Sequence, residues 1–280
     1  MKKITRRSFL AAAGLTAAAL ALTACGGSSS STASSVASSA AASSEAASSS
    51  AAAAEVTTVE AGKLTMATNA AFPPYEMTTD SGDFEGIDIE TAQAIADKLG
   101  LELQIDDMDF DAALLSVQQG KADIVMAGVT VTDERKAVMD FSDSYATGIQ
   151  SIIVPEGSDI ASPDDLAGKK IGTQRGTTGY IYCSDDFGDE NVVAYDDGLT
   201  AVQALNNGQV DAVVIDNAPA QEFVAANPGL VILETSYAEE DYAIGMAKGS
   251  SLEDAINAAL EELKADGTLQ SIVDKYISAE

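Results

Sequence analysis

The sequence contains no histidine and only two cysteines, Cys25 and Cys183. Without histidine, the chain cannot form a Ser-His-Asp or Cys-His catalytic system. Zinc and copper sites of the usual kind are also excluded, because no histidine or cysteine cluster supplies their ligands. Cys183 has no basic neighbour in the sequence, so we interpret it as a small packing residue rather than a nucleophile. We therefore expect no metal, no cofactor and no disulfide within the folded part of the chain.

Positive charge is scarce as well. The chain carries 15 lysines and arginines against 44 aspartates and glutamates, which gives a formal net charge of −29 at pH 7. A protein this acidic is repelled by nucleic acids and by anionic membrane surfaces. We expect a monomer that has no nucleic-acid partner and that reaches a membrane only through an attached lipid.

The sequence also lacks an apolar run long enough to span a membrane comfortably. Its longest candidate, Phe9–Leu22, is short and rich in alanine, glycine and threonine, and it follows a head with four basic residues. The run Leu22–Gly26 resembles the end of a bacterial lipoprotein signal peptide. That resemblance implies removal of residues 1–24 and attachment of diacylglycerol and palmitate to Cys25. An ordinary secretory signal is the alternative, and Thr5–Leu10 also resembles a twin-arginine export signal.

Residues 25–55 have little apolar surface to bury. After Gly27 this stretch consists almost wholly of serine and alanine. Such side chains cannot offset the entropy lost on ordering, so we expect a disordered tether behind Cys25. As a flexible coil it would reach roughly 30 Å, enough to hold a folded domain away from a membrane.

The remaining residues, 56–280, alternate between strand and helix patterns. Leu64–Ala67 and Glu102–Ile105 are predicted strands, and the apolar residues of Ile89–Leu99 mark one face of a helix that Gly100 ends. Ser162–Asp165 has the cap, proline and acids of a helix start, and Leu252–Leu263 predicts an amphipathic helix ending near Gly267. This alternation indicates α/β architecture with largely parallel sheets.

A near-repeat organises this part of the chain. Ala113–Val125 and Ala201–Val213 share one design, in which a helix is followed by a glycine, an aspartate and a strand. The repeat predicts two lobes, although such junctions also arise by chance. It places Gly128 and Asp216 at equivalent strand ends. Because ligands of open α/β sheets bind beyond the carboxyl ends of strands, both residues should face one cleft.

Several ordered motifs then resemble one protein family, the extracellular solute-binding proteins of ABC importers that bind polar and charged amino acids. The resemblance covers about Lys63 to Ile277 and rests on the order of the motifs, since none is specific by itself. The matching runs are Phe72-Pro73-Pro74-Tyr75-Glu76, Gly86-Ile87-Asp88-Ile89-Glu90, Gly120-Lys121-Ala122-Asp123, Thr132-Asp133-Glu134-Arg135, Phe141-Ser142, Gly176-Thr177-Thr178 and Lys264-Ala265-Asp266-Gly267.

The resemblance implies a two-lobe, periplasmic-binding-protein-like α/β fold in which each lobe has a mostly parallel sheet flanked by helices. Lobe one would combine residues 56–147 and 244–280, and lobe two would take residues 148–243. Two crossings, near Ala146–Gln150 and Tyr242–Gly245, would form the hinge. Glycines in both crossings suit the backbone changes of closure.

The two ends of an α-amino acid match two charged residues. Arg135 offers the permanent charge and the paired donors that a carboxylate prefers, and the family's carboxylate-binding arginine corresponds to it. Asp216 offers an anion for the ammonium and corresponds to the family's ammonium-binding aspartate. The resemblance adds backbone and hydroxyl contacts at Gly128, Thr130 and Thr178. Surface ion pairing of Arg135, or a solvated Asp216, is the alternative interpretation.

The pocket for the ligand side chain is less clearly marked. Phe72 corresponds to the family's aromatic wall, unless it is simply a core residue. Asn69 stands where binders of cationic amino acids often carry aspartate, and Gln174 can hydrogen-bond an amide or carboxylate. These residues favour a neutral polar amino acid, such as glutamine or cystine.

The expected function is capture of that amino acid between the lobes and delivery to the membrane subunits of an ABC permease, at the extracytoplasmic face of the cell membrane. We expect no enzymatic activity. The alternatives are a dehydratase or lyase of the same fold, with Glu76 as general acid or base, and a surface lipoprotein that senses its ligand.

Overall fold

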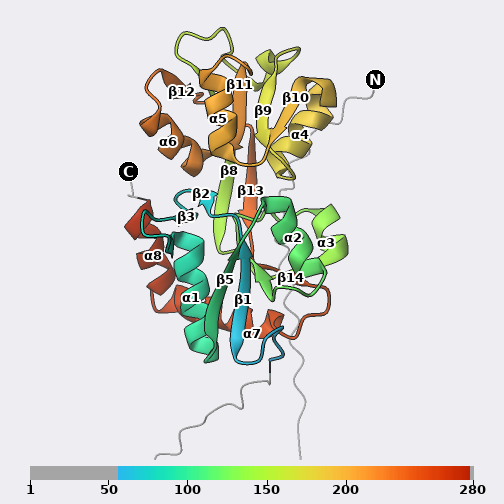
Figure 1. The fold of residues 1–280 in the computed structure, drawn as a ribbon, viewed down its shortest axis with the longest axis vertical. Coiled ribbons are helices and arrows are strands. Elements are labelled where there is room, and N and C mark those ends of the chain that lie inside the picture. Colours follow the sequence, from blue (N-terminus) through green and yellow to red (C-terminus); the bar gives the residue numbers. More distant parts are fainter. Residues whose placement is uncertain (1–55, 278–280) are drawn as a thin grey trace, which may run out of the picture. The chain divides into compact units, whose positions relative to one another are not determined.

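Two mixed sheets form the centre of the protein. The computed structural model describes residues 56–277, so residues 1–24, Cys25 and the 25–55 segment lie outside the described part. The first sheet has the strand order β5-β1-β6-β14-β7, and Figure 1 shows β5 and β1 side by side in it. Its strands are β1 (Lys63–Thr68), β5 (Glu102–Asp107), β6 (Ile124–Val125), β7 (Met139–Phe141) and β14 (Gly245–Ala247).

The second sheet has the order β10-β9-β11-β8-β12, and β13 also pairs with β8. Its strands are β8 (Ala146–Pro155), β9 (Ile171–Gln174), β10 (Val192–Tyr195), β11 (Ala212–Asp216), β12 (Leu230–Ile232) and β13 (Ala238–Tyr242). Each sheet contains a parallel trio, β5-β1-β6 or β10-β9-β11, to which antiparallel strands are added. The predicted α/β class is therefore confirmed, with antiparallel pairs beside the parallel ones.

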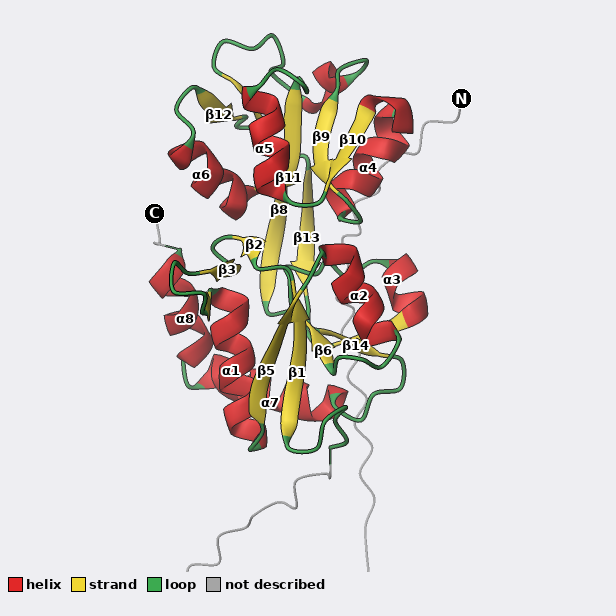
Figure 2. Cartoon of the chain, in the orientation of Figure 1, coloured by secondary structure: helices red, strands yellow, loops and turns green. Residues whose placement is uncertain are grey.

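Helices cover both sheets (Figure 2). The first sheet is packed by α1 (Ile87–Leu99), α2 (Phe110–Gln118) and α3 (Asp133–Val138), and the second by α4 (Thr178–Phe187), α5 (Gly198–Asn206) and α6 (Asn217–Ala226). Helices α7 (Glu253–Ala265) and α8 (Thr268–Tyr276) pack against α1 and against each other. We call each sheet with its helices a lobe. In the second lobe, α4 places Cys183 in one apolar core, and burial raises the pKa of its thiol to about 12.

The two predicted repeat units have the same structure. In the first, α2 leads through Gly120 to β6, and in the second, α5 leads through Gly208 to β11. Both glycines have positive φ, at 65° and 68°, where other residues are disfavoured. Gly100 ends α1 in the same way, with φ 69°.

Three details differ from the sequence-based expectations. The predicted helix at Ser162 is only a 3₁₀ turn, η1 (Pro163–Leu166), because Gly168 adopts φ +76° and turns the chain away. The predicted cap is present, and Ser162 and Asp165 form a reciprocal capping box. A second short 3₁₀ segment is η2 (Asp189–Asn191). A small antiparallel sheet of β2 (Ala71–Phe72), β3 (Glu76–Thr78) and β4 (Phe84–Glu85) was not predicted, nor was α8.

The chain passes between the lobes at two neighbouring places. Strands β8 and β13 form an antiparallel ladder in which Tyr242 lies opposite Ala146, and β14 begins in the first sheet at Gly245. The glycines here serve close packing: a Cβ at Gly148 would lie 2.4 Å from the Tyr242 ring, and one at Gly245 would lie 2.7 Å from Val125.

Candidate ligand-binding site

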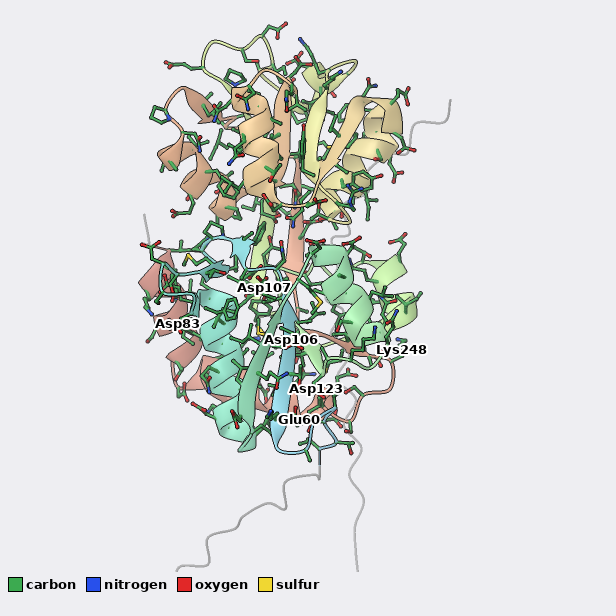
Figure 3. The ribbon with its side chains drawn as sticks, viewed as in Figure 1. Glu60, Asp83, Asp106, Asp107, Asp123 and Lys248 are labelled. Atoms are coloured by element: carbon green, nitrogen blue, oxygen red, sulfur yellow. The ribbon has the colours of Figure 1, made fainter. Side chains whose placement is uncertain are left out.

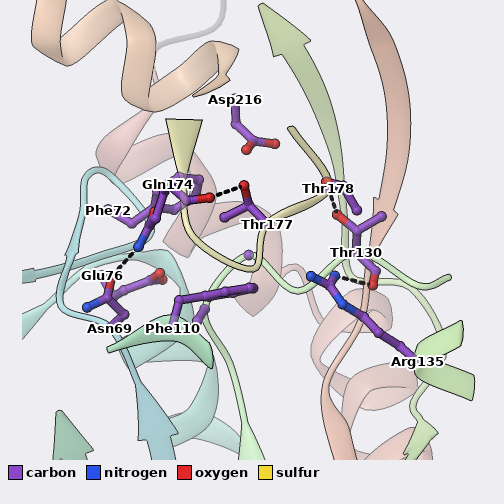
Figure 4. Close-up of a pocket in the computed structure, with 12 residues that line it drawn as sticks. Asn69, Phe72, Glu76, Phe110, Thr130, Arg135, Gln174, Thr177, Thr178 and Asp216 are labelled. Carbon is purple, nitrogen blue, oxygen red and sulfur yellow. Dashed lines mark hydrogen bonds between the residues drawn. The ribbon is translucent and has the colours of Figure 1, made fainter. Parts of the chain in front are cut away.

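One pocket at the carboxyl ends of strands in both sheets collects all eight residues that the sequence singled out (Figure 4). These are Asn69, Phe72, Gly128, Thr130, Arg135, Gln174, Thr178 and Asp216. Glu76, Phe110, Ala127 and Thr177 complete the lining. Of these four, the sequence pointed only to Glu76, and only as the general acid or base of an enzyme.

Arg135 lies at the start of α3 with its guanidinium inside the protein. The Thr132 hydroxyl caps this helix by accepting the Arg135 N–H at 3.1 Å. Nη1 donates to the Thr130 carbonyl at 2.7 Å, and Nη2 donates to the Gly176 carbonyl of the other lobe at 3.1 Å. The Phe110 ring lies 5.4 Å from the guanidinium carbon, within cation–π range.

Burial is the main influence on the pKa of Arg135 and lowers it, while Glu240 acts in the opposite direction. Arginine stays charged in proteins despite such shifts. The site therefore holds a fixed, largely desolvated cation whose remaining N–H groups are available to an anion.

Asp216 ends β11 and stands at the N-cap position of α6 without capping it through its side chain. Its carboxylate instead accepts a hydrogen bond from the Tyr242 hydroxyl. Burial raises the pKa of Asp216 to about 7, and the Tyr242 hydrogen bond opposes this shift. Figure 4 shows Asp216 and Arg135 on separate sides of the pocket, so the site offers an anion and a cation at two different places.

Gly128 lines the pocket at a position where a residue with a side chain would not fit. Its φ is +55°, and a Cβ there would lie 2.9 Å from the Phe72 ring. Its N–H donates to Oδ2 of Asp88 at 3.0 Å, and Asp88 also accepts from the Tyr145 hydroxyl at 2.7 Å. Burial raises the pKa of Asp88 to about 6. Asp88, at the start of α1, therefore holds the backbone of Gly128 in place.

Two neutral amide side chains, those of Asn69 and Gln174, also line the pocket. Nε2 of Gln174 donates to Oδ1 of Asn69 at 2.7 Å, and this hydrogen bond joins the two lobes. Asn69 is held in turn, because its Nδ2 donates to the Met108 carbonyl and the neighbouring Ala70 N–H donates to Asp107. Figure 3 shows Asp107 on the side of the first lobe that faces the second sheet. An asparagine and a glutamine thus line the pocket with fixed orientations.

Glu76 lies beside these amides and is completely buried. Its carboxyl group lies against that of Asp88, and apart from this contact neither of its oxygens has a hydrogen-bond partner among the described residues. Burial raises the pKa of Glu76 well above its ordinary value, and the neighbouring Asp88 raises it further. A buried polar group without a partner is costly, so Glu76 brings unused hydrogen-bonding capacity to the pocket.

The family is identified by its sequence profile. The profile of the bacterial extracellular solute-binding proteins, family 3, matches residues 64–279. The chain belongs to this family. The profile spans both lobes and includes all twelve residues of the pocket.

Relatives of this family 3 protein bind amino acids. The L-cystine-binding protein TcyJ of Escherichia coli K12 is 33% identical over 226 residues, which are 79% of this chain and 85% of TcyJ. Solved structures of an ancestral arginine-binding protein, one bound to arginine and one bound to glutamine, are 43% and 42% identical, each with a TM-score of 0.74. Each alignment covers 78% of this chain and 99% of the ancestral protein.

These relatives confirm the two-lobe fold and the class of protein, an amino-acid-binding component of ABC transporters. The chain is a solute-binding protein of an extracellular family, and its relatives are named as binding proteins rather than enzymes. Within residues 56–277, no helix combines the length and apolar character that a membrane span requires.

Proposed function

We propose that this protein captures a free α-amino acid in the pocket between its lobes and delivers it to the membrane subunits of an ABC permease. The observation that carries the proposal is the pairing of buried Arg135 with buried Asp216 around one pocket. Arg135 binds the carboxylate, and the positive end of the α4 helix dipole, which begins at Thr178, favours the same anion. Asp216 binds the ammonium, and the backbone and hydroxyl groups of Gly128, Thr130 and Thr178 add further contacts to the ligand.

For the ligand side chain, Asn69 and Gln174 favour a neutral polar amino acid such as glutamine or cystine. Their amides pair with each other at 2.7 Å, and a ligand amide is able to take over these hydrogen bonds. Protonated Glu76 would add one donor and one acceptor, which also suits an amide.

Glu76 favours a second candidate, arginine. A guanidinium binds a carboxylate through paired, charge-assisted hydrogen bonds, and apart from its contact with Asp88 the Glu76 carboxylate has no hydrogen-bond partner among the described residues. Asn69 occupies the position where an aspartate would signal a cationic ligand, but Glu76 supplies a carboxylate to the same pocket. The ancestral arginine-binding structures bound to arginine and to glutamine support both candidates.

A thermal-shift screen of residues 56–280 against all proteinogenic amino acids and cystine tests the proposed function. We expect stabilisation by one or a few polar α-amino acids, since a ligand that binds only the folded state raises its stability by RT ln(1 + [L]/Kd). Glu76→Gln then separates the candidates: it should weaken arginine binding by about tenfold or more and change glutamine binding by much less. A screen in which no α-amino acid shifts the melting temperature would overturn the proposal.

We further propose that the protein works as a monomer and closes about the crossings near Ala146–Gln150 and Tyr242–Gly245. Lobe one would comprise residues 56–147 and 244–280, and lobe two residues 148–243. The supporting contacts are the interlobe hydrogen bonds from Gln174 to Asn69 and from Arg135 to Gly176, which cannot form with the lobes apart. Small-angle scattering of the same screened domain should therefore show a smaller radius of gyration with its ligand, because ligand favours the state that it contacts most.

The membrane anchor rests on residues outside the described structure. We propose that residues 1–24 are removed and that Cys25 carries diacylglycerol and palmitate. Two or more acyl chains hold a protein stably at a membrane, at about 0.8 kcal/mol for each buried CH₂ group. Mass spectrometry of the mature chain should show a lipidated Cys25 at the N-terminus, and Cys25→Ala should abolish membrane retention. An unmodified N-terminus located after Cys25 would contradict this prediction.

A further inference from the structure

Glu240 is a buried acid behind the ligand pocket that the proposed function does not use. It lies on β13 opposite Gly148 of β8 and is 7% exposed. Its Oε2 atom accepts three hydrogen bonds, from the Thr130 hydroxyl at 3.1 Å, the Thr178 hydroxyl at 2.9 Å and Nε2 of Gln150 at 3.0 Å. Glu240 therefore contacts two pocket residues that come from different lobes.

These contacts fix the direction of both threonine hydroxyl groups. A hydroxyl has one proton to donate and two lone pairs that accept, and Oε2 of Glu240 is the acceptor in all three hydrogen bonds. Both hydroxyl protons must therefore point at Glu240. Thr130 and Thr178 also line the pocket (Figure 4), so they present lone pairs to it. Their oxygens lie 3.4 Å apart, which allows one donor group to contact both.

We propose that Glu240 is a positioning residue that turns Thr130 and Thr178 into hydrogen-bond acceptors for the ammonium group of the ligand. This inference rests on the proposed function, since it assumes an α-amino acid in the pocket. An ammonium has three donors and no acceptor, so it matches lone pairs from the two hydroxyls together with the Asp216 carboxylate. A carboxylate in the same place would meet only lone pairs, which assigns it to Arg135 and to backbone N–H groups.

The arrangement also links recognition to closure. Thr130 precedes α3 in the first lobe, whereas Thr178 begins α4 in the second. Glu240 joins both hydroxyls to one oxygen atom only when the lobes are together. A ligand without an ammonium gains nothing from this pair of acceptors, so Glu240 makes the closed pocket selective for amino acids over other carboxylic acids of similar shape.

Glu240→Met is the decisive variant, because it keeps an unbranched side chain of similar length and removes both acceptor oxygens. The threonine protons then lose the group that holds them and are free to turn towards the pocket. Glu239→Met is the matched control, since it makes the same exchange on the same strand at an exposed position. Melting temperatures of both variants establish that they are folded.

The readout is the ratio of affinities for an amino acid and for the same molecule without its ammonium group. The probes are L-arginine with 5-guanidinopentanoate, and L-glutamine with 4-carbamoylbutanoate, measured by calorimetry. We expect Glu240→Met to lower the ratio by about tenfold or more, which corresponds to a hydrogen bond with a charged partner. Binding of the ammonium-free probes should change by less than about twofold, and Glu239→Met should leave both affinities unchanged.

Glu240 also lies near Arg135 and raises the pKa of that residue. The experiment must therefore distinguish an effect of Glu240 on Arg135 from its effect on the two threonines. If Glu240 acted through Arg135 or through folding alone, Glu240→Met would change both members of each probe pair equally, and the proposal would be wrong. Tighter binding of both probes would also overturn it, since the hydroxyls would then serve the carboxylate.

A second variant keeps Glu240 and removes both hydroxyls. Thr130→Val combined with Thr178→Val should lower the same ratio, and adding Glu240→Met to this pair should lower it no further. An additional loss in the triple variant would show that Glu240 acts independently of the threonines and would overturn the proposal. Failure of the wild-type chain to bind either amino acid would instead refute the proposed function, so the two failures are distinguishable.

Discussion

Replacing Arg135 with alanine should weaken amino-acid binding by about tens to thousands of fold while the chain stays folded. Arg135 is 8% exposed and sits on the same pocket as Asp216. Removing one partner of a buried charged contact costs about 2–5 kcal/mol, largely because the other charge is left unpaired. About 1.4 kcal/mol corresponds to a factor of ten in Kd. Calorimetry with the amino acid found by screening provides the measurement.

Two further variants identify the cause of that loss. Lys136→Ala removes an exposed positive charge from the next residue of the same helix and should leave the affinity unchanged. Arg135→Lys keeps the charge but loses the planar fork that contacts Thr130 and Gly176, so it should recover only part of the binding. If Arg135→Ala bound within about twofold of wild type, the carboxylate assignment would be wrong.

The architecture was predictable where short-range patterns determine it. Gly100 and the apolar face before it define the end of α1, and the repeated helix–glycine–strand units locate β6 and β11. Gly128 and Asp216 lie at or just beyond the ends of those strands, so the general rule about strand ends placed both at the pocket. The short helix signal at Ser162 was misleading, because Gly168 ends the segment after one turn.

Other features depend on contacts between residues far apart in the sequence. Glu240 meets Thr130 across 110 positions and Thr178 across 62, and no local pattern marks it as a site residue. The close contact of Gly148 with Tyr242, which leaves no room for a side chain at that glycine, also joins residues that are distant in the sequence. Phe110 lies at the start of a helix that follows a strand, as other pocket residues do. Its contact with the Arg135 guanidinium, however, could be seen only in the folded structure.

Asp216→Asn should weaken amino-acid binding by about ten- to a thousandfold, because it removes the anion that faces the ammonium while keeping the shape of the side chain. The same substitution should also remove the part of the pH dependence of binding that comes from the ionisation of Asp216. Glu222→Gln, an exposed position on α6, removes the same charge and serves as the control. Calorimetry between about pH 5.5 and 8, on either side of the raised pKa, measures both effects, with circular dichroism to confirm that the variants are folded.

The direction of the pH dependence follows from the burial of Asp216. Its pKa is raised from 3.8 to about 7, and the ammonium requires the ionised form. Wild-type affinity should therefore decrease by up to about tenfold for each pH unit below about 7, with release of a proton on binding. Without ligand the sign reverses: the folded state holds this proton more tightly than the unfolded state, so stability falls as pH rises from about 4 to about 7.

Other titratable groups lie near Asp216, and their contributions to the pH dependence of binding must be distinguished from its own. Tyr242 donates to it, Glu240 raises its pKa, and Asp88, with a pKa of about 6, titrates on the other side of the pocket. Asp216→Asn leaves these groups in place, so any pH dependence that survives in the variant belongs to them. The number of protons released on ligand binding at about pH 6.5, measured by calorimetry in buffers of different ionisation enthalpy, should be smaller in the variant than in wild type. Equal release in both would show that Asp216 is not the group to which the ammonium binds.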